Sequence, residues 1–187
     1  VLVFLLFYKL GENIAGQLIH PFLIDIGFDA GTVGLINKGV GMPASIAGTI
    51  LGGFAVTRIG IRRSLLIFGI LQAVPNLLYG MLVQVGPSEG ALTLIVITDQ
   101  FCNGLAVAAL VVFLMSLCDR RFTAFQYAAL SSATAILGRF VSGWSGVIQE
   151  EIGWQWFFTM SALAGLPALV MLFFLPKGAG LPRVTAK

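Results

Sequence analysis

Long apolar runs, separated by short polar connections, make up almost the whole chain. Six of these runs reach the roughly 20 residues that an α-helix needs to cross a bilayer. They cover residues 1–26, 32–56, 64–85, 91–117, 122–148 and 153–175. Because lipid offers the backbone no hydrogen-bond partners, and no run alternates like a barrel strand, we expect every run to be helical. The pattern predicts an all-α integral membrane protein, with a six-transmembrane-helix bundle over residues 1–176 and a cytoplasmic tail over 177–187.

The composition agrees with a membrane protein and argues against several other classes. The chain is 58% hydrophobic and only 10% charged, and its net charge of +3 is not gathered into a stretch that suits nucleic acid. It contains no HExxH, GxSxG or phosphate-loop motif, and a single histidine with two distant cysteines leaves no zinc set. We therefore expect no enzyme, no catalytic residues, and no metal or cofactor. The start at Val1, inside an apolar run, leads us to expect a section of a longer protein.

Charged residues in the connections alternate in sign along the chain. The connections after the second, fourth and sixth runs carry the basic residues Arg58, Arg62 and Arg63, then Arg120 and Arg121, then Lys177, Arg183 and Lys187. The other three carry the acidic residues Asp25 and Asp29, then Glu89, then Glu150 and Glu151. Because basic connections stay on the cytoplasmic side of a membrane, we expect both ends of the chain in the cytoplasm.

Two connections resemble each other and suggest an internal repeat. The connection after the second run reads GFAVTRIGIRRSL from Gly53, and the one after the fifth reads GVIQEEIGWQWFF from Gly146. Both contain G-x5-I-G, and a proline follows in each next run, Pro75 and Pro167. The charge of the connection is opposite in the two copies, as expected of two three-helix units with inverted topology.

Polar side chains inside the apolar runs are the candidate functional residues. In the first run, Lys9, Glu12, Asn13, Gln17 and His20 are spaced to share one face of a helix. Candidates in the other runs are Asn37, Lys38, Asp99, Gln100, Asn103 and Arg139. A charge facing lipid costs at least about 2.5–3.5 kcal/mol, so we expect these residues to line a solute and proton pathway. The exception is His20, which lies beside Pro21 near the outer surface and is interpreted as a polar anchor.

The charged candidates leave two interpretations open. In one, Lys9, Lys38 and Arg139 present positive charge to an anionic solute, while Glu12 or Asp99 exchanges protons because desolvation favours a neutral carboxyl group. In the other, Lys9 and Glu12 form a structural ion pair within one helix and neutralise each other. The amide candidates would bind hydroxyl and amide groups of the solute in either case.

Small residues recur along one face of the second run, at Gly41, Ser45, Gly48 and Gly52. Small side chains let the backbones of membrane helices approach closely. The stripe therefore predicts a helix-packing surface, either static or sliding between moving helices.

The connection from Gly53 to Leu65 resembles the signature of the major facilitator superfamily, G-x-L-a-D-r-x-G-r-k. Gly53, Arg58, Gly60 and Arg62 fall on matching positions, whereas Thr57 replaces the acidic residue and Ile61 the first basic residue after the glycine. The resemblance implies a gating loop between two helices of this fold.

A more specific resemblance, along most of the chain, is to the AmpG muropeptide permeases of that superfamily. The stretches that carry it are YKLGENIAG, NKGVG, LLIFGILQAVPNLLYG, LMSLCDRRFTAFQYAALSS and LGRFVSGW. It implies a twelve-helix, proton-driven importer of anhydromuropeptides (GlcNAc-anhydroMurNAc peptides) for peptidoglycan recycling, in the bacterial inner membrane. This chain would be the C-terminal six-helix half. Its partners would be the N-terminal half, the lipid bilayer, protons and a small anionic sugar-peptide.

Two other functions remain open at this stage. The first is a major facilitator carrier of another anionic solute, such as acetyl-CoA, since the two kinds of carrier share ancestry. The second is a different class altogether, an intramembrane enzyme or a structural fragment that does not transport.

Overall fold

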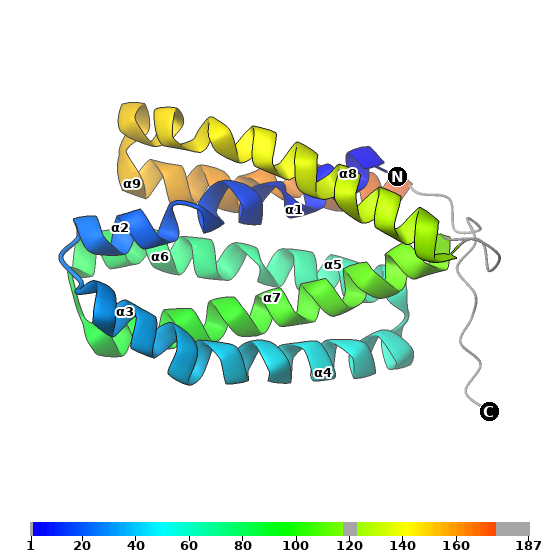
Figure 1. The fold of residues 1–187 in the computed structure, drawn as a ribbon, viewed down its shortest axis with the longest axis horizontal. Coiled ribbons are helices and arrows are strands. Elements are labelled where there is room, and N and C mark those ends of the chain that lie inside the picture. Colours follow the sequence, from blue (N-terminus) through cyan, green and yellow to red (C-terminus); the bar gives the residue numbers. More distant parts are fainter. Residues whose placement is uncertain (1, 118–122, 175–187) are drawn as a thin grey trace.

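The computed structural model describes residues 2–117 and 123–174, and helices account for nearly all of them (Figure 1). In chain order the elements are α1 (Leu2–Gly16), α2 (Ile19–Asp25), α3 (Ala30–Ile36), the π-helix η1 (Asn37–Gly41), α4 (Met42–Ile59), α5 (Ile61–Leu71), α6 (Ala73–Val85), α7 (Glu89–Leu117), α8 (Thr123–Gly143), α9 (Ser145–Ala164) and α10 (Leu166–Phe174). The described residues contain no strand. The predicted all-α class is thus confirmed for the part of the chain that the structure describes.

Among the described residues, four helical stretches are long and apolar enough to cross a membrane, which agrees with an integral membrane bundle. They are Ala30–Ile59, Ile61–Val85, Glu89–Ser116 and Ser145–Met171. The predicted runs 1–26 and 122–148 are not among them, although α1, α2 and α8 occupy much of their length. A count of six membrane helices therefore stays a prediction. The tail predicted over 177–187 lies outside the described residues.

Prolines explain where the long runs divide into shorter helices. Pro21, Pro75 and Pro167 each lie in the first turn of the helix that follows a break, in α2, α6 and α10 respectively, and Pro43 lies in the first turn of α4, where the π-helix η1 passes into an α-helix. A proline is tolerated there because the first-turn N–H groups have no partner within the helix. The first run, which the spacing of its polar residues predicted as one helix, is consequently interrupted after Gly16.

The two glycines that end the G-x5-I-G segments have nearly the same backbone conformation. Gly60 connects α4 to α5 with φ 84° and ψ 156°, and Gly153 interrupts α9 with φ 75° and ψ 165°. Positive φ favours glycine because it has no Cβ. The start of α9 continues the direction of α8, and the rest of α9 runs back beside it (Figure 1). Both glycines therefore reverse the chain.

The helices lie side by side along one axis, so that their connections gather at two ends (Figure 1). One end, called here the basic end, holds the α4–α5 connection, where Arg58, Arg62 and Arg63 lie. The opposite end, called the acidic end, holds the α2–α3 and α6–α7 connections, where Asp25 and Glu89 lie. The alternating charges of the sequence thus separate in space. The predicted basic residues Arg120, Arg121, Lys177, Arg183 and Lys187 lie outside the described residues.

The buried apolar side chains form two clusters, one toward each end. The cluster toward the basic end includes Phe4, Leu65 and Phe113, and the cluster toward the acidic end includes Phe22 and Phe158. Between the two clusters, α1, α6, α7 and α9 each place a polar side chain beside a shared cavity: Glu12, Asn76, Asp99 and Ser161. A polar layer therefore crosses the bundle at about half its height.

The small-residue stripe of α4 packs directly against α7. A Cβ on Gly48 would overlap the backbone carbonyl of Phe101, and one on Gly52 would lie 2.9 Å from the Cα of Leu105. Gly104 on α7 approaches the carbonyl of Ser45 in the same way. In this conformation the stripe is a closely packed helix contact.

Candidate solute-binding site

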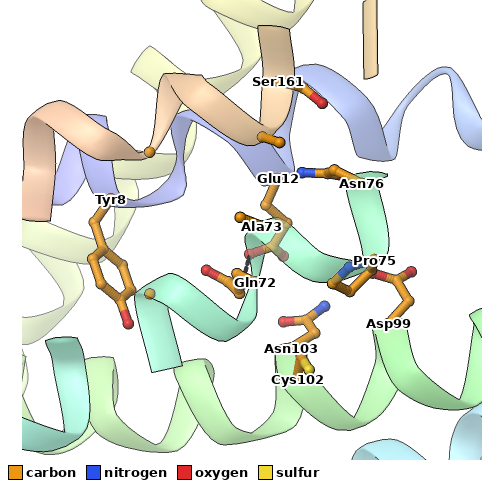
Figure 2. A pocket seen from close by; sticks show the side chains of 13 residues that line it. Tyr8, Glu12, Gln72, Ala73, Pro75, Asn76, Asp99, Cys102, Asn103 and Ser161 are labelled. Carbon is orange, nitrogen blue, oxygen red and sulfur yellow. Dashed lines mark hydrogen bonds between the residues drawn. The ribbon is translucent and has the colours of Figure 1, made fainter. Parts of the chain in front are cut away.

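The polar layer is the candidate site, and Figure 2 shows its side chains converging from several helices. Its members are Tyr8 and Glu12 on α1, Gln72 between α5 and α6, Asn76 and Tyr79 on α6, Asp99 and Asn103 on α7, and Ser161 on α9. Polar groups at this depth need partners because lipid supplies none. The partners each group has, or lacks, determine what the site can bind.

Glu12 has its negative charge compensated within the protein. The ammonium of Lys9, one turn earlier on α1, lies 3.0 Å from its Oε2. The side-chain amide of Gln72 donates a hydrogen bond to the same oxygen at 3.0 Å. The ion pair expected in one of the two interpretations of these residues is therefore formed.

Asp99 has a hydroxyl partner instead of a cation. Tyr79 donates to its Oδ2 over 3.4 Å, a long hydrogen bond. The tyrosine ring is fixed by stacking on Phe158 at 5.5 Å between centroids and by an edge contact with Phe22 at 6.3 Å. Within the described residues, no lysine or arginine forms an ion pair with Asp99.

Two carboxamides at the same level have hydrogen-bonding groups that no described residue satisfies. The Oδ1 of Asn103 is buried and accepts no hydrogen bond within the described part of the chain. Asn76 is only 8% exposed, and no described residue bonds to its side chain. Most buried polar groups in proteins are hydrogen-bonded, so unpaired ones at a site favour a bound solute or water.

Two adjacent cavities, which share four lining residues, reach these groups. A small cavity of about 40 Å³ is lined by Tyr8, Gln72 and Ser161, among others. A larger cavity of about 350 Å³ extends from it toward the acidic end. Both are lined by Glu12, Asn76, Asp99 and Asn103. The larger one, called here the amide cavity, is also lined by Asn13, Gln17, His20, Asn37, Tyr79 and Gln100.

A third cavity of about 300 Å³ lies toward the basic end, beside α1, α7 and α8. It is lined by Lys9, Tyr127 and Ser131 together with apolar residues. Asn13 lines both this cavity and the amide cavity. The Lys9–Glu12 ion pair therefore joins a residue of the third cavity to a residue of the other two.

The structure brings most of the predicted pathway residues to these cavities. Those that line at least one cavity are Lys9, Glu12, Asn13, Gln17, Asn37, Asp99, Gln100 and Asn103. Lys38 and Arg139 are exposed and line none of the three. His20, which the sequence placed outside the site, lines the amide cavity.

The residues of the predicted gating loop lie at the basic end. Gly60 makes the reversal between α4 and α5, and the guanidinium of Arg58 lies 5.0 Å from the centroid of the Phe54 ring. Gly53 is on α4 with open space beside it, and Arg62 is half-buried on α5. None of them lines a cavity of the polar layer.

Sequence reasoning missed Gln72, Asn76 and Tyr79, which line the site from the third run. A signal was present: positions 72, 76 and 79 share one helical face, and two of them are amides near the middle of a mainly apolar run. Pro75 lies between the two amides, where the helix breaks.

Comparison with known proteins finds relatives among permeases, whereas no protein-family model matches the chain. It is 38% identical over 173 residues to the anhydromuropeptide permease of Escherichia coli K12, covering 92% of this chain and 35% of that protein. It is 32% identical over 175 residues to the putative transporter AmpG 4 of Rickettsia conorii, covering 94% and 42%. It is also 32% identical over 172 residues to the putative transporter AmpG 1 of Rickettsia bellii, covering 92% and 42%.

The likeness to these relatives has two consequences. The chain spans about two fifths of the length of the curated relatives it matches, and the match covers nearly all of the chain. The relatives are named as a permease and transporters, which are not enzymes, and this confirms the expectation that the chain is not an enzyme.

Proposed function

We propose that this chain, which belongs to the AmpG family of permeases, forms one half of a proton-driven importer of anhydromuropeptides. The observation that carries the proposal is the polar layer at mid-height of the bundle, with cavities leading from it toward both ends. Secondary transporters place their solute and coupling-ion sites at this depth. The candidate substrate is the solute after which the E. coli relative is named.

Several features support a C-terminal six-helix half of a major facilitator fold, made of two inverted three-helix units. Gly60 and Gly153 end the two similar sequence segments and reverse the chain with the same conformation. Each reversal is followed by a helix break at Pro75 or Pro167. The packing follows the same symmetry. If α7 corresponds to α1 and α8 to α4, the contact of α4 with α7 should have a counterpart between α8 and α1, and both contacts are present.

The other half would come from the part of the protein that this chain does not cover. Its relatives are more than twice as long, and a cavity of this fold is enclosed between two halves that move against each other. We place both ends of the chain in the cytoplasm and the protein in the bacterial inner membrane, because the basic α4–α5 connection lies at the end of the bundle opposite the acidic connections.

Glu12 and Asp99 are the groups that we propose for proton exchange. Both are carboxyl groups in the polar layer, and both line the small cavity and the amide cavity. Asp99 is the stronger candidate, because Glu12 is bonded to Lys9 and Gln72, whereas the one bond that Asp99 has with a described residue is the long one from Tyr79. A carboxyl group that loses and regains a proton as the cavity changes its access would couple solute movement to the gradient.

The test is uptake of radiolabelled anhydromuropeptide by vesicles that contain the full-length protein. An inward proton gradient should drive accumulation, and a protonophore should abolish it. Asp99→Asn and Glu12→Gln should keep downhill exchange but lose gradient-driven accumulation about tenfold or more. Glu89→Gln, which changes an exposed carboxyl group in the first turn of α7, is the matched control and should behave as wild type.

Wild-type vesicles that accumulate no muropeptide would contradict the transport proposal. Full accumulation by both amide variants would contradict the roles of the two carboxyl groups.

A further inference from the structure

The amide cavity has an unusual balance of chemical groups. Six of the side chains that line it are carboxamides: Asn13, Gln17, Asn37, Asn76, Gln100 and Asn103. It also contains the carboxyl groups of Glu12 and Asp99 and the imidazole of His20. Among the described residues, no lysine or arginine lines it. The balance of charge is therefore opposite to what an anionic solute requires.

The three cations that sequence analysis assigned to an anionic solute do not line the amide cavity. Lys9 lines the third cavity and pairs with Glu12. Lys38 and Arg139 are exposed and line none of the three cavities. A solute carboxylate in the amide cavity would face Asp99 without a neighbouring cation, and like charges repel strongly at low dielectric.

Several of the amides that line the cavity have hydrogen-bonding capacity that no described residue uses. Asn103 has an unpaired buried Oδ1, and the side chain of Asn76 has no bond to a described residue. Asn37 uses its Nδ2 to donate to the carbonyl of Val33 at 3.1 Å, which leaves its Oδ1 as an acceptor. Carboxamides both donate and accept, as hydroxyl and acetamido groups do.

We propose that the amide cavity binds the uncharged, hydroxyl- and acetamido-bearing part of the solute, and that Asn76 and Asn103 determine this specificity. The carboxylates of the solute are then bound by residues outside this cavity. The inference rests on the proposed function, and it assigns the two chemically different parts of a sugar-peptide to different places in the transporter.

Calorimetry on the full-length protein in detergent tests the assignment with two separate probes. One is N,N′-diacetylchitobiose, a neutral N-acetylated disaccharide, and the other is the free acidic stem peptide of the muropeptide. Asn76→Leu and Asn103→Leu remove the amide but keep most of the side-chain volume. Each should weaken disaccharide binding about tenfold, because a site that hydrogen-bonds a solute loses affinity when one partner is removed. Peptide binding should change less than twofold.

The matched control is Gln84→Leu, which removes an exposed amide of α6 that lines no cavity of the site and should alter neither probe. The corresponding serine variants, measured wherever a leucine variant does not fold, should show a smaller loss in the same direction. Equal losses for both probes, unchanged disaccharide binding, or a wild type that does not bind the disaccharide would overturn the inference. A wild type that binds the disaccharide but takes up no muropeptide would contradict the proposed function and leave the amide-cavity assignment standing.

Discussion

Lys9 and Glu12 compensate each other's charge one turn apart on α1, and both side chains are about a quarter exposed. Each charge is stabilised chiefly by the other, so removing one partner leaves the second uncompensated at membrane depth. We expect Lys9→Met and Glu12→Gln each to lower the free energy of unfolding by about 1–2 kcal/mol. The double variant should lose about 1 kcal/mol less free energy of unfolding than the two single variants added together, because the second substitution removes the charge that the first leaves without a partner.

Unfolding of the full-length protein in mixed micelles would measure this coupling. Lys38→Met is a suitable control, since this lysine is exposed and no described residue forms an ion pair with it. Its effect should stay within about 0.5 kcal/mol. Strict additivity of the two single effects would show that the pair contributes no coupling to stability.

Sequence analysis found the site residues that are charged or lie close to a charge in the same run, and it missed the uncharged face formed by positions 72, 76 and 79. Glu12 and Asp99 stand out because an ionisable group in an apolar run is costly unless it has a function or a partner. Gln72 and Tyr79 carry no such cost in the sequence, and their roles depend on contacts with α1 and α7. Those contacts arise from the packing of distant runs, which the spacing within one run does not contain.

At the scale of the helices, the contact of α4 with α7 gives a test with an internal control. A Cβ on Gly48 would overlap the carbonyl of Phe101, whereas one on Gly53, on the same helix, would meet nothing within 4 Å. Gly48→Ala should therefore lower the free energy of unfolding by about 1–3 kcal/mol, because two backbones would have to separate. Gly53→Ala should leave it unchanged or raise it slightly, since alanine favours helix. Equal effects in the micelle unfolding assay would show that the stripe does not determine the packing.

The sequence predicted the helices better than their breaks. Apolar length and the absence of alternation predicted helical runs, and the structure confirms them in the residues it describes. The break after Gly16 was missed because the polar residues of the first run have a helical spacing across it. Pro21 was the available signal, but a proline in a membrane run shows that a break is tolerated and not where it falls.

For the whole molecule, the separation of basic and acidic ends gives a test of orientation. Single cysteines replacing Ser88 or Gln149 lie near the acidic end, and one replacing Arg62 lies at the basic end. A membrane-impermeant thiol reagent added outside intact cells should label the first two and not the third, because basic connections remain cytoplasmic. A background with the native cysteines replaced is needed, since Cys102 is a thiol, although a buried one. Labelling of Arg62→Cys alone would reverse the proposed orientation.

The proposed division into halves predicts that this chain does not transport by itself. The amide cavity and the third cavity are each walled by helices of this chain, yet alternating access needs a second half to close the opposite side. Vesicles that contain residues 1–187 alone should therefore show background uptake of anhydromuropeptide, while vesicles with the full-length protein accumulate it.

The polar layer belongs to this chain, so the isolated chain should still bind the neutral disaccharide weakly. Co-expression with the missing part as a separate chain should restore uptake, which distinguishes an incomplete carrier from a misfolded one. Robust uptake by the isolated chain would instead mean that its copies assemble into a complete carrier.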